Sequence, residues 1–359
     1  MSNIVKRLEN YGRLAANLPG ALRDAIENRP YGWGEYQEQL ATWKPEIYRV
    51  RRGQHQLAVE CLLHLQDDAP QAPLYVNMGG YSTPAMLYGP LGRAVWQRGL
   101  NALMVSLPGH GHTDLPAMQY RTYRQSAKIV YEAIEQVRTE YGLTGELRVL
   151  GHSHGGGMAQ AMAAEVGDAV SRYYILAGVG GPEWTRLAKL FARALEDIRR
   201  GQLFTDDVAD SWQRLSGFVS DGYIVIPPPW ELAGWQAELI RPFASGWHDD
   251  SLTNLYSVLV DTLLASAEEL EGCLKVMGTL GADTIILAGL ADGVITSEVI
   301  KSQARAAAKP DQASAPVFKS KTTHAGFLAK TGRDYVAHKV ALTAEELAAK
   351  IPDHILAAA

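Results

Sequence analysis

The chain has 359 residues, 20% of them charged, and a net charge of −5. This length suits an α/β enzyme with an insertion better than a single small domain. The 34 Lys and Arg residues are spread along the chain, which argues against a nucleic-acid-binding surface. No apolar stretch is long enough to span a bilayer, and the first residues have mixed polarity, so we expect a cytoplasmic protein. Cys61 and Cys273 match no disulfide or zinc spacing and are predicted to be reduced, buried thiols.

The N-terminal part of the chain is predicted to form an extension followed by a hairpin. Residues 1–45 have a partly polar helical pattern that is interrupted at Pro30-Tyr31-Gly32. Residues 46–51 and 55–65 are expected to be two strands joined at Gly53. Beyond residue 72, strand and helix patterns alternate.

This alternation predicts the fold class. The expected strands are 74–78, 102–107, 147–150, 173–178, 284–288 and 317–320, and the expected helices are 85–98, 122–141, 344–351 and the segment after residue 155. Helix 122–141 places Ala127, Val130, Tyr131, Ile134 and Val137 on one face and ends at Gly142. Short apolar strands between amphipathic helices predict an α/β protein whose mostly parallel sheet is covered on both faces.

The strand and helix rhythm stops between residues 182 and 281. We interpret this segment as a helical cap inserted after strand 173–178, which leaves 46–181 and 282–359 as the core. Five of the eight tryptophans lie in it, namely Trp184, Trp212, Trp230, Trp235 and Trp247. Two interpretations of these rings remain open. They form the core of the cap itself, or they line an apolar substrate pocket.

The sequence at 151–155, Gly-His-Ser-His-Gly, follows a strand and opens a helix. In that context a Gly-x-Ser-x-Gly match indicates a nucleophile elbow, a strained turn that exposes a serine hydroxyl at the end of a strand. Ser153 is therefore the candidate nucleophile.

A nucleophilic serine needs a base, and the base needs an acid that orients it. Asp292 follows strand 284–288, and His324 follows strand 317–320. Taken singly, Asp292 fits a turn beside a glycine, and His324 fits a surface or packing histidine. The order Ser, Asp, His, each after a strand end, favours a catalytic triad.

These motifs resemble those of the α/β-hydrolase-fold serine hydrolases with an inserted lid, over roughly residues 46–358. The elbow falls on 151–155, a Gly-x-x-Asp acid loop on 289–292 and the late histidine on 324. Residues 107–113 resemble the Pro-Gly-x-Gly-x-Ser/Thr turn after the fourth strand, and 77–81 stand where the family carries its oxyanion loop.

Two positions depart from the family pattern. Asn77-Met78 replaces the usual histidine before the oxyanion glycine, and Ser106 replaces the aspartate that often precedes the Pro-Gly turn. Neither position belongs to the triad, because oxyanion donors are backbone amides. The departures leave the subfamily open.

The resemblance implies roles for the triad. Ser153 would attack an acyl carbon, with His324 acting as base and then as acid. Asp292 would fix the imidazole tautomer and stabilise the imidazolium, and Glu183 is the alternative acid if Asp292 is dispensable.

The same resemblance implies an oxyanion hole and a partner class. The backbone amides of Gly80 and His154 would bind the oxyanion, with Tyr81 as a candidate side-chain donor. We expect a small-molecule substrate, no cofactor, no metal and no nucleic-acid partner, and we leave a homodimer open.

Other interpretations of the polar motifs were weighed. His110, His112, His152 and His154 lie in loops after strands, but no acidic residue is fixed beside them by spacing, so a metal site is disfavoured. Residues 247–250, Trp-His-Asp-Asp, fit either a site for a substrate amine or a solvated turn.

The predicted activity is hydrolysis of an ester-type bond (ester, lactone or thioester) in a fairly apolar small molecule. A serine nucleophile argues against dehalogenases and epoxide hydrolases, which use aspartate. Cleavage of a carbon–carbon or amide bond by the same residues is the alternative within the enzymes. A ligand receptor or non-hydrolytic scaffold is the alternative outside them.

Overall fold

The computed structural model describes residues 45–202, 205–211, 256–290, 295–320 and 330–347, with the single residues 43, 254, 292, 322, 324, 327 and 349. Most of the predicted extension at 1–45 and the middle of the predicted cap, 212–253, lie outside the described residues. None of the helices within the described ranges has the length and apolar character that crossing a membrane requires.

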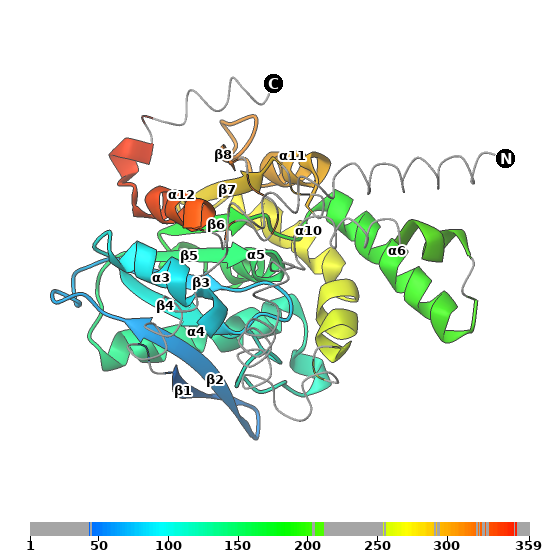
Figure 1. Ribbon diagram of the computed structural model, residues 1–359, viewed down its shortest axis with the longest axis horizontal. Coiled ribbons are helices and arrows are strands. Elements are labelled where there is room, and N and C mark those ends of the chain that lie inside the picture. The colour runs from blue at the N-terminus through cyan, green and yellow to red at the C-terminus, as the bar shows by residue number, and fades with distance from the viewer. Residues whose placement is uncertain are drawn as a thin grey trace, which may run out of the picture.

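Among the described residues, eight strands form one sheet in the order β1-β2-β4-β3-β5-β6-β7-β8 (Figure 1). The strands are β1 Pro45–Arg52, β2 His55–His64, β3 Leu74–Met78, β4 Asn101–Val105, β5 Leu147–His152, β6 Arg172–Leu176, β7 Asp283–Gly289 and β8 Val317–Ser320. β2 pairs antiparallel with β1 and with β4, and the other neighbours are parallel. The predicted mostly parallel sheet is confirmed.

Helices cover both faces of this sheet. They are α3 Gly89–Trp96, α4 Tyr123–Glu140, α5 His154–Val166, α6 Pro182–Arg199, α10 Ala267–Met277, α11 Ser297–Ala306 and α12 Lys330–Ala341. α3 and α12 pack together on one side, and α4, α5 and α10 pack together on the other (Figure 1). Every residue of β3, β4, β5 and β6 is buried, because neither face of these strands meets water.

The structure differs from the sequence prediction in three helical segments. The predicted helix 85–98 is a 3₁₀ turn, Ala85–Tyr88, followed by the shorter α3. α11 and α12 were not predicted; they are short helices of 10 and 12 residues. The predicted helix 344–351 is helical at 344–347, and most of its remainder lies outside the described residues.

The predicted cap begins with α6, directly after β6, but its last part belongs to the helical layer of the core. α10 packs against α5, and a Cβ built at Gly157 would lie 2.9 Å from Cδ1 of Leu270. Residues 267–277 therefore cover the sheet beside α5. The domain division at 182–281 as a whole stays a prediction.

The start of α5 is fixed against the end of β3, and this contact sets the position of the elbow. The Gly155 amide donates to the carbonyl oxygen of Gly79 at 2.9 Å. A Cβ at Gly155 would collide with the carbonyl oxygens of Met78 and Gly79, which are backbone atoms and cannot turn aside. Only glycine fits at residue 155.

We expect Gly155→Ala to lower the free energy of unfolding by at least about 2 kcal/mol, because the added methyl must push two backbone segments apart. Gly272 is the matched control, since it lies on the exposed side of α10 with nothing near its Cβ position. Gly272→Ala should raise the free energy of unfolding by about 0.5–1 kcal/mol through helix propensity. Urea denaturation measures both, and equal effects of the two substitutions would contradict the close packing at Gly155.

Candidate active site

Ser153 lies in a strained turn between β5 and α5. Its backbone has φ 54° and ψ −116°, a conformation that residues with a side chain rarely adopt. The Ser153 amide donates to Leu176 O at 3.0 Å, and its carbonyl accepts from Val179 N at 3.0 Å. A Cβ at Gly151 would strike the carbonyl of Gly155, so the turn needs glycine there. The sequence prediction of a tight strand–turn–helix at this serine is confirmed.

Asp292 and His324 form a buried pair at the ends of β7 and β8. Nδ1 of His324 is 2.8 Å from Oδ2 of Asp292, and the side chains are 0% and 1% exposed. The other carboxylate oxygen, Oδ1, accepts from the amide of Ile295 at 2.8 Å. A carboxylate can only accept at Nδ1, so a neutral His324 presents its lone pair at Nε2.

His324 lies against the elbow through His152, the residue before Ser153. The rings of His152 and His324 have centroids 5.0 Å apart, and Nε2 of His152 is 3.0 Å from the carbonyl oxygen of His324. The structure therefore gathers the serine, aspartate and histidine singled out by the sequence at the carboxyl edge of the sheet, on loops after β5, β7 and β8.

The predicted oxyanion residues lie at the same edge. The amide of Gly155 donates to the carbonyl oxygen of Gly79, and the amide of Gly156 donates to that of Ser153. His154 is the remaining amide in this part of the first turn of α5, and the described residues supply no acceptor for it. The amide of Gly80 donates to the phenol oxygen of Tyr88 at 2.8 Å, so it is committed to an internal partner here. The role of Gly80 as an oxyanion donor stays a prediction.

Comparison with known proteins agrees with this architecture. The model of the alpha/beta hydrolase family matches residues 76–337, well over half of the chain. The chain belongs to the alpha/beta hydrolase family. No curated protein sequence matches it.

Solved structures similar to this alpha/beta hydrolase include three described as hydrolases or esterases. A hydrolase from Pseudomonas aeruginosa PA01 is 16% identical with a TM-score of 0.57, covering 83% of this chain and 99% of that one. 2-Hydroxy-6-oxo-6-phenylhexa-2,4-dienoate hydrolase from Rhodococcus sp. strain RHA1 is 15% identical (TM-score 0.54; 83% and 98% covered). An esterase from Exiguobacterium antarcticum is 17% identical (TM-score 0.53; 79% and 94% covered). At these identities the likeness shows a shared fold.

Two further imidazoles of this alpha/beta hydrolase stack beside the nucleophile turn. The rings of His110 and His154 have centroids 5.7 Å apart at 24°, and Tyr81 meets His110 edge-on at 6.0 Å. The hydroxyl of Tyr123 lies 2.9 Å from Nδ1 of His154. Burial lowers the pKa of His110 to about 4 and that of His154 well below its usual value. Both rings are neutral at physiological pH.

The histidine pairs of the sequence do not build a metal site in the part of the chain that the structure describes, where no group of three or more His, Cys, Asp or Glu side chains is placed to hold an ion. His112 instead lies with its ring partly exposed, Nε2 4.0 Å from Glu60. Glu60, on β2, accepts from Ser106 Oγ at 2.5 Å and from the His112 amide at 3.2 Å. A carboxylate from β2 thus supports the Pro-Gly turn where Ser106 departs from the family pattern.

The remaining candidates lie on α6, in the buried core or outside the described residues. Trp184 is buried in the hydrophobic core on α6, and Glu183 pairs with Arg186 at 2.8 Å on the same helix. Cys61 and Cys273 are free and buried, as predicted. The other four cap tryptophans, Trp212, Trp230, Trp235 and Trp247, lie outside the described residues, as does the polar segment 247–250.

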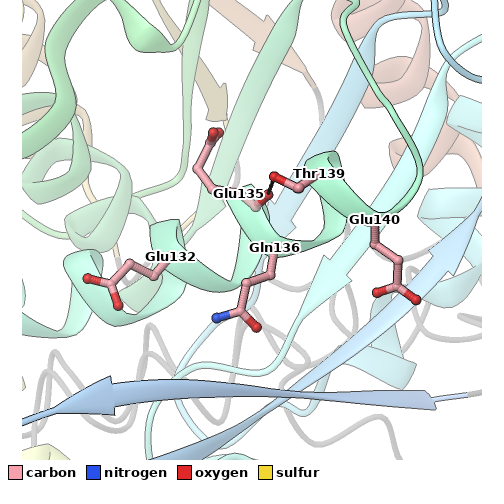
Figure 2. A pocket seen from close by; sticks show the side chains of 5 residues that line it. All are labelled: Glu132, Glu135, Gln136, Thr139 and Glu140. Carbon is pink, nitrogen blue, oxygen red and sulfur yellow. Dashed lines mark hydrogen bonds between the residues drawn. The ribbon is translucent and has the colours of Figure 1, made fainter.

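A surface pocket on α4 is unrelated to this site. Figure 2 shows its lining, Glu132, Glu135, Gln136, Thr139 and Glu140, which all project from α4. Their polar groups make contacts with the protein itself, such as the Thr139 hydroxyl donating to the Glu135 carbonyl at 2.8 Å and Glu132 pairing with Arg52 of β1 at 2.5 Å. None of the five residues belongs to the serine, histidine and aspartate set described above.

Sequence reasoning missed two tyrosines at the site, Tyr88 and Tyr123. Each hydroxyl contacts an imidazole of the elbow, Tyr88 that of His152 at 2.7 Å and Tyr123 that of His154 at 2.9 Å. No motif marks either tyrosine, because each reaches the elbow from a distant segment of the chain. Only the histidines that they contact were visible in the sequence, as part of the elbow motif.

The buried imidazoles predict a loss of stability in acid. Burial holds the pKa of His110 at about 4 and of His152 at about 3, below the value of about 6.5 in an unfolded chain. The unfolded state therefore binds protons first, so the stability is present above about pH 6.5 and is lost as the pH falls. Each histidine should contribute up to about 1.4 kcal/mol per pH unit between about pH 6 and its folded pKa.

Urea denaturation between pH 7.5 and about pH 5 measures this slope. We expect His110→Gln to flatten it, and His55→Gln, at an exposed position on β2, to leave it unchanged. Equal slopes for the wild type and both variants would contradict the lowered pKa of His110.

Proposed function

We propose that this alpha/beta hydrolase is a serine hydrolase that cleaves an ester-type bond (ester, lactone or thioester) in a fairly apolar small molecule through an acyl-serine intermediate. The observation that carries the proposal is the buried Asp292–His324 pair at 2.8 Å, held beside the strained turn of Ser153. A carboxylate on Nδ1 orients an imidazole and stabilises the imidazolium that forms when it takes a proton. The family membership and the strand–turn–helix at 151–155 support the same conclusion.

In the proposed reaction, Oγ of Ser153 attacks the acyl carbon while Nε2 of His324 takes the hydroxyl proton. His324 then returns the proton to the leaving oxygen or sulfur as the bond to the acyl carbon breaks. A water molecule then attacks the acyl carbon while Nε2 of His324 takes its proton. His324 returns that proton to Oγ of Ser153 as the acyl–serine bond breaks, giving the acid product and free Ser153. Asp292 keeps the tautomer of His324 that has its lone pair at Nε2.

The negative oxygen of the tetrahedral intermediate needs donors beside Ser153. We assign the amide of His154, at the positive end of α5, and the phenol of Tyr81. Burial raises the pKa of Tyr81 to about 12, so its hydroxyl keeps its proton at neutral pH. Gly80, whose amide is engaged by Tyr88, would join these donors only by exchanging that bond for one to the oxyanion.

The substrate class follows from the charge of the walls beside the nucleophile. His110 and His154 are neutral because they are buried, and the rings of Tyr81 and Tyr123 pack against them, so the groups packed around the start of α5 are aromatic and uncharged. Such surroundings suit an uncharged, fairly apolar acyl group at Ser153. The cap tryptophans other than Trp184 are the proposed wall of the substrate pocket.

A fluorophosphonate probe tests for an activated serine. We expect one covalent adduct on Ser153 at neutral pH, detected by mass spectrometry of the intact protein and its peptides, because only a serine with a base reacts readily. Ser153→Ala should abolish labelling, whereas Ser297→Ala, at an exposed position on α11, should not change it. A wild-type protein that stays unlabelled would favour a ligand-binding scaffold without turnover.

We expect Asp292→Asn to lower kcat on p-nitrophenyl esters by roughly 10³–10⁴-fold, because the imidazole loses the group that fixes its tautomer. The unfolding temperature should change little, since the amide has the shape of the carboxylate. Glu183→Gln is the control and should leave kcat unchanged. If Asp292→Asn keeps near-normal turnover and Glu183→Gln does not, Glu183 is the acid.

The type of bond is tested with a panel of substrates. A protein that reacts normally with the fluorophosphonate but cleaves amides or carbon–carbon bonds and no esters would be an amide or carbon–carbon bond hydrolase.

A further inference from the structure

A chain of buried hydrogen bonds joins the loop after β3 to the loop that carries His324. The amide of Gly80 donates to Oη of Tyr88 at 2.8 Å, and Oη of Tyr88 is 2.7 Å from Nδ1 of His152. On the other side of the ring, Nε2 of His152 is 3.0 Å from the carbonyl oxygen of His324. These hydrogen bonds thus connect three parts of the sequence that are far apart, namely residues 80–88, His152 and His324.

The direction of every bond in this chain is fixed by elementary chemistry. A carbonyl oxygen only accepts, so Nε2 of His152 must carry a hydrogen. Burial and the nearby His324 lower the pKa of His152 to about 3, so the ring is neutral and Nδ1 has no hydrogen. Tyr88 must therefore donate to Nδ1, and its oxygen is left to accept from Gly80. Reversing any of these three bonds would leave at least one of them unmade, and Thr83 is a further hydrogen-bond partner of the Tyr88 hydroxyl.

The surroundings leave these groups little room to move. Tyr88 is fully buried and His152 is 1% exposed. A Cβ at Gly79 would lie 2.6 Å from Cε2 of the Tyr88 ring, so the ring packs directly on the backbone at the end of β3. The same loop is closed by Thr83, whose hydroxyl donates to the Gly80 carbonyl at 2.5 Å.

We propose that Tyr88 and His152 are positioning residues, which hold the backbone of His324 at a fixed distance from the oxyanion glycines by keeping the His152 ring in its Nε2–H tautomer. The proposal deepens the proposed function and rests on His324 being the base. Without the Tyr88 hydroxyl, Nδ1 of His152 loses its donor, and the tautomer with hydrogen on Nδ1 becomes competitive. That tautomer has no hydrogen to donate to the His324 carbonyl, and the repulsion between two acceptors moves His324.

A small displacement of the base is enough to affect the rate. Reacting groups must be aligned closely, and a shift of about 1 Å costs about 10²-fold in rate. The binding of the ground state does not depend on the base. The expected signature is a fall in kcat with an unchanged KM.

The kinetic test is Tyr88→Phe with Tyr75→Phe as its matched control. Tyr75 is a fully buried tyrosine on β3 whose hydroxyl donates to Asn77 Oδ1 at 3.2 Å, so both variants lose one buried hydroxyl. We expect Tyr88→Phe to lower kcat on a p-nitrophenyl ester by about 10–100-fold with KM within about twofold, and Tyr75→Phe to lower kcat by less than about threefold. Equal kcat values for the two variants would overturn the proposal.

The second pair of variants separates the hydrogen bond from packing. His152→Gln keeps a side-chain N–H for the His324 carbonyl, and His152→Leu fills the space without one. We expect His152→Gln to retain at least about tenfold more kcat than His152→Leu. The reverse order, or no difference, would contradict the positioning role. If Tyr88→Phe does not fold, the kcat values of His152→Gln and His152→Leu still test the positioning role.

A spectroscopic measurement is independent of turnover. Nitrogen-15 NMR of the ring nitrogens, assigned through the His152→Gln variant, should report the Nε2–H tautomer for His152 in the wild type and in Ser153→Ala. Tyr88→Phe should show loss of that tautomer. A wild-type His152 with hydrogen on Nδ1 would overturn the proposal. If Ser153→Ala retains ester turnover, the proposed function fails. The tautomer measured for His152 still supports or contradicts the role of Tyr88 in fixing that tautomer.

Discussion

The site depends on one backbone constraint, the positive φ of Ser153. Left alone, this conformation is unfavourable for a residue with a side chain, and it persists because the surrounding structure determines it. The amide and carbonyl of Ser153 bond to Leu176 and Val179, on and just after β6, and the amide of Gly155 bonds to Gly79, just after β3. Bonds to both neighbouring strands of β5 therefore hold the turn. These bonds fix the direction in which the Ser153 side chain leaves the backbone.

Burial gives the imidazoles around this turn different tasks. His110, His152 and His154 are kept neutral by desolvation, whereas His324 contacts the buried carboxylate of Asp292. A neutral ring can donate at one nitrogen and accept at the other, which suits a link in a hydrogen-bond chain. A neutral ring whose Nδ1 bonds to a carboxylate has its lone pair at Nε2. Histidine thus supplies both the neutral rings that hold neighbouring groups in place and the proposed base.

Two departures from the family pattern have physical explanations in the structure. Where Ser106 stands in place of aspartate, Glu60 brings a carboxylate from β2 to the same turn, so the charge comes from another strand. Where Asn77-Met78 precedes the oxyanion glycine in place of histidine, Tyr88 packs on Gly79 and accepts from Gly80. In both places a different residue provides the contact that holds the backbone.

The sequence by itself determined the fold class, all eight strand positions to within about two residues, and the serine, aspartate and histidine at the ends of β5, β7 and β8. These features are local, since strands have short apolar runs and the elbow needs its glycines at fixed spacing. Only the tertiary structure decided that Asp292 and His324 touch, that Tyr88 and Tyr123 reach the elbow histidines, and that α10 lies beside α5. Those contacts join residues tens to more than a hundred positions apart, and their distances depend on how helices and strands pack, which periodicity along the chain does not encode.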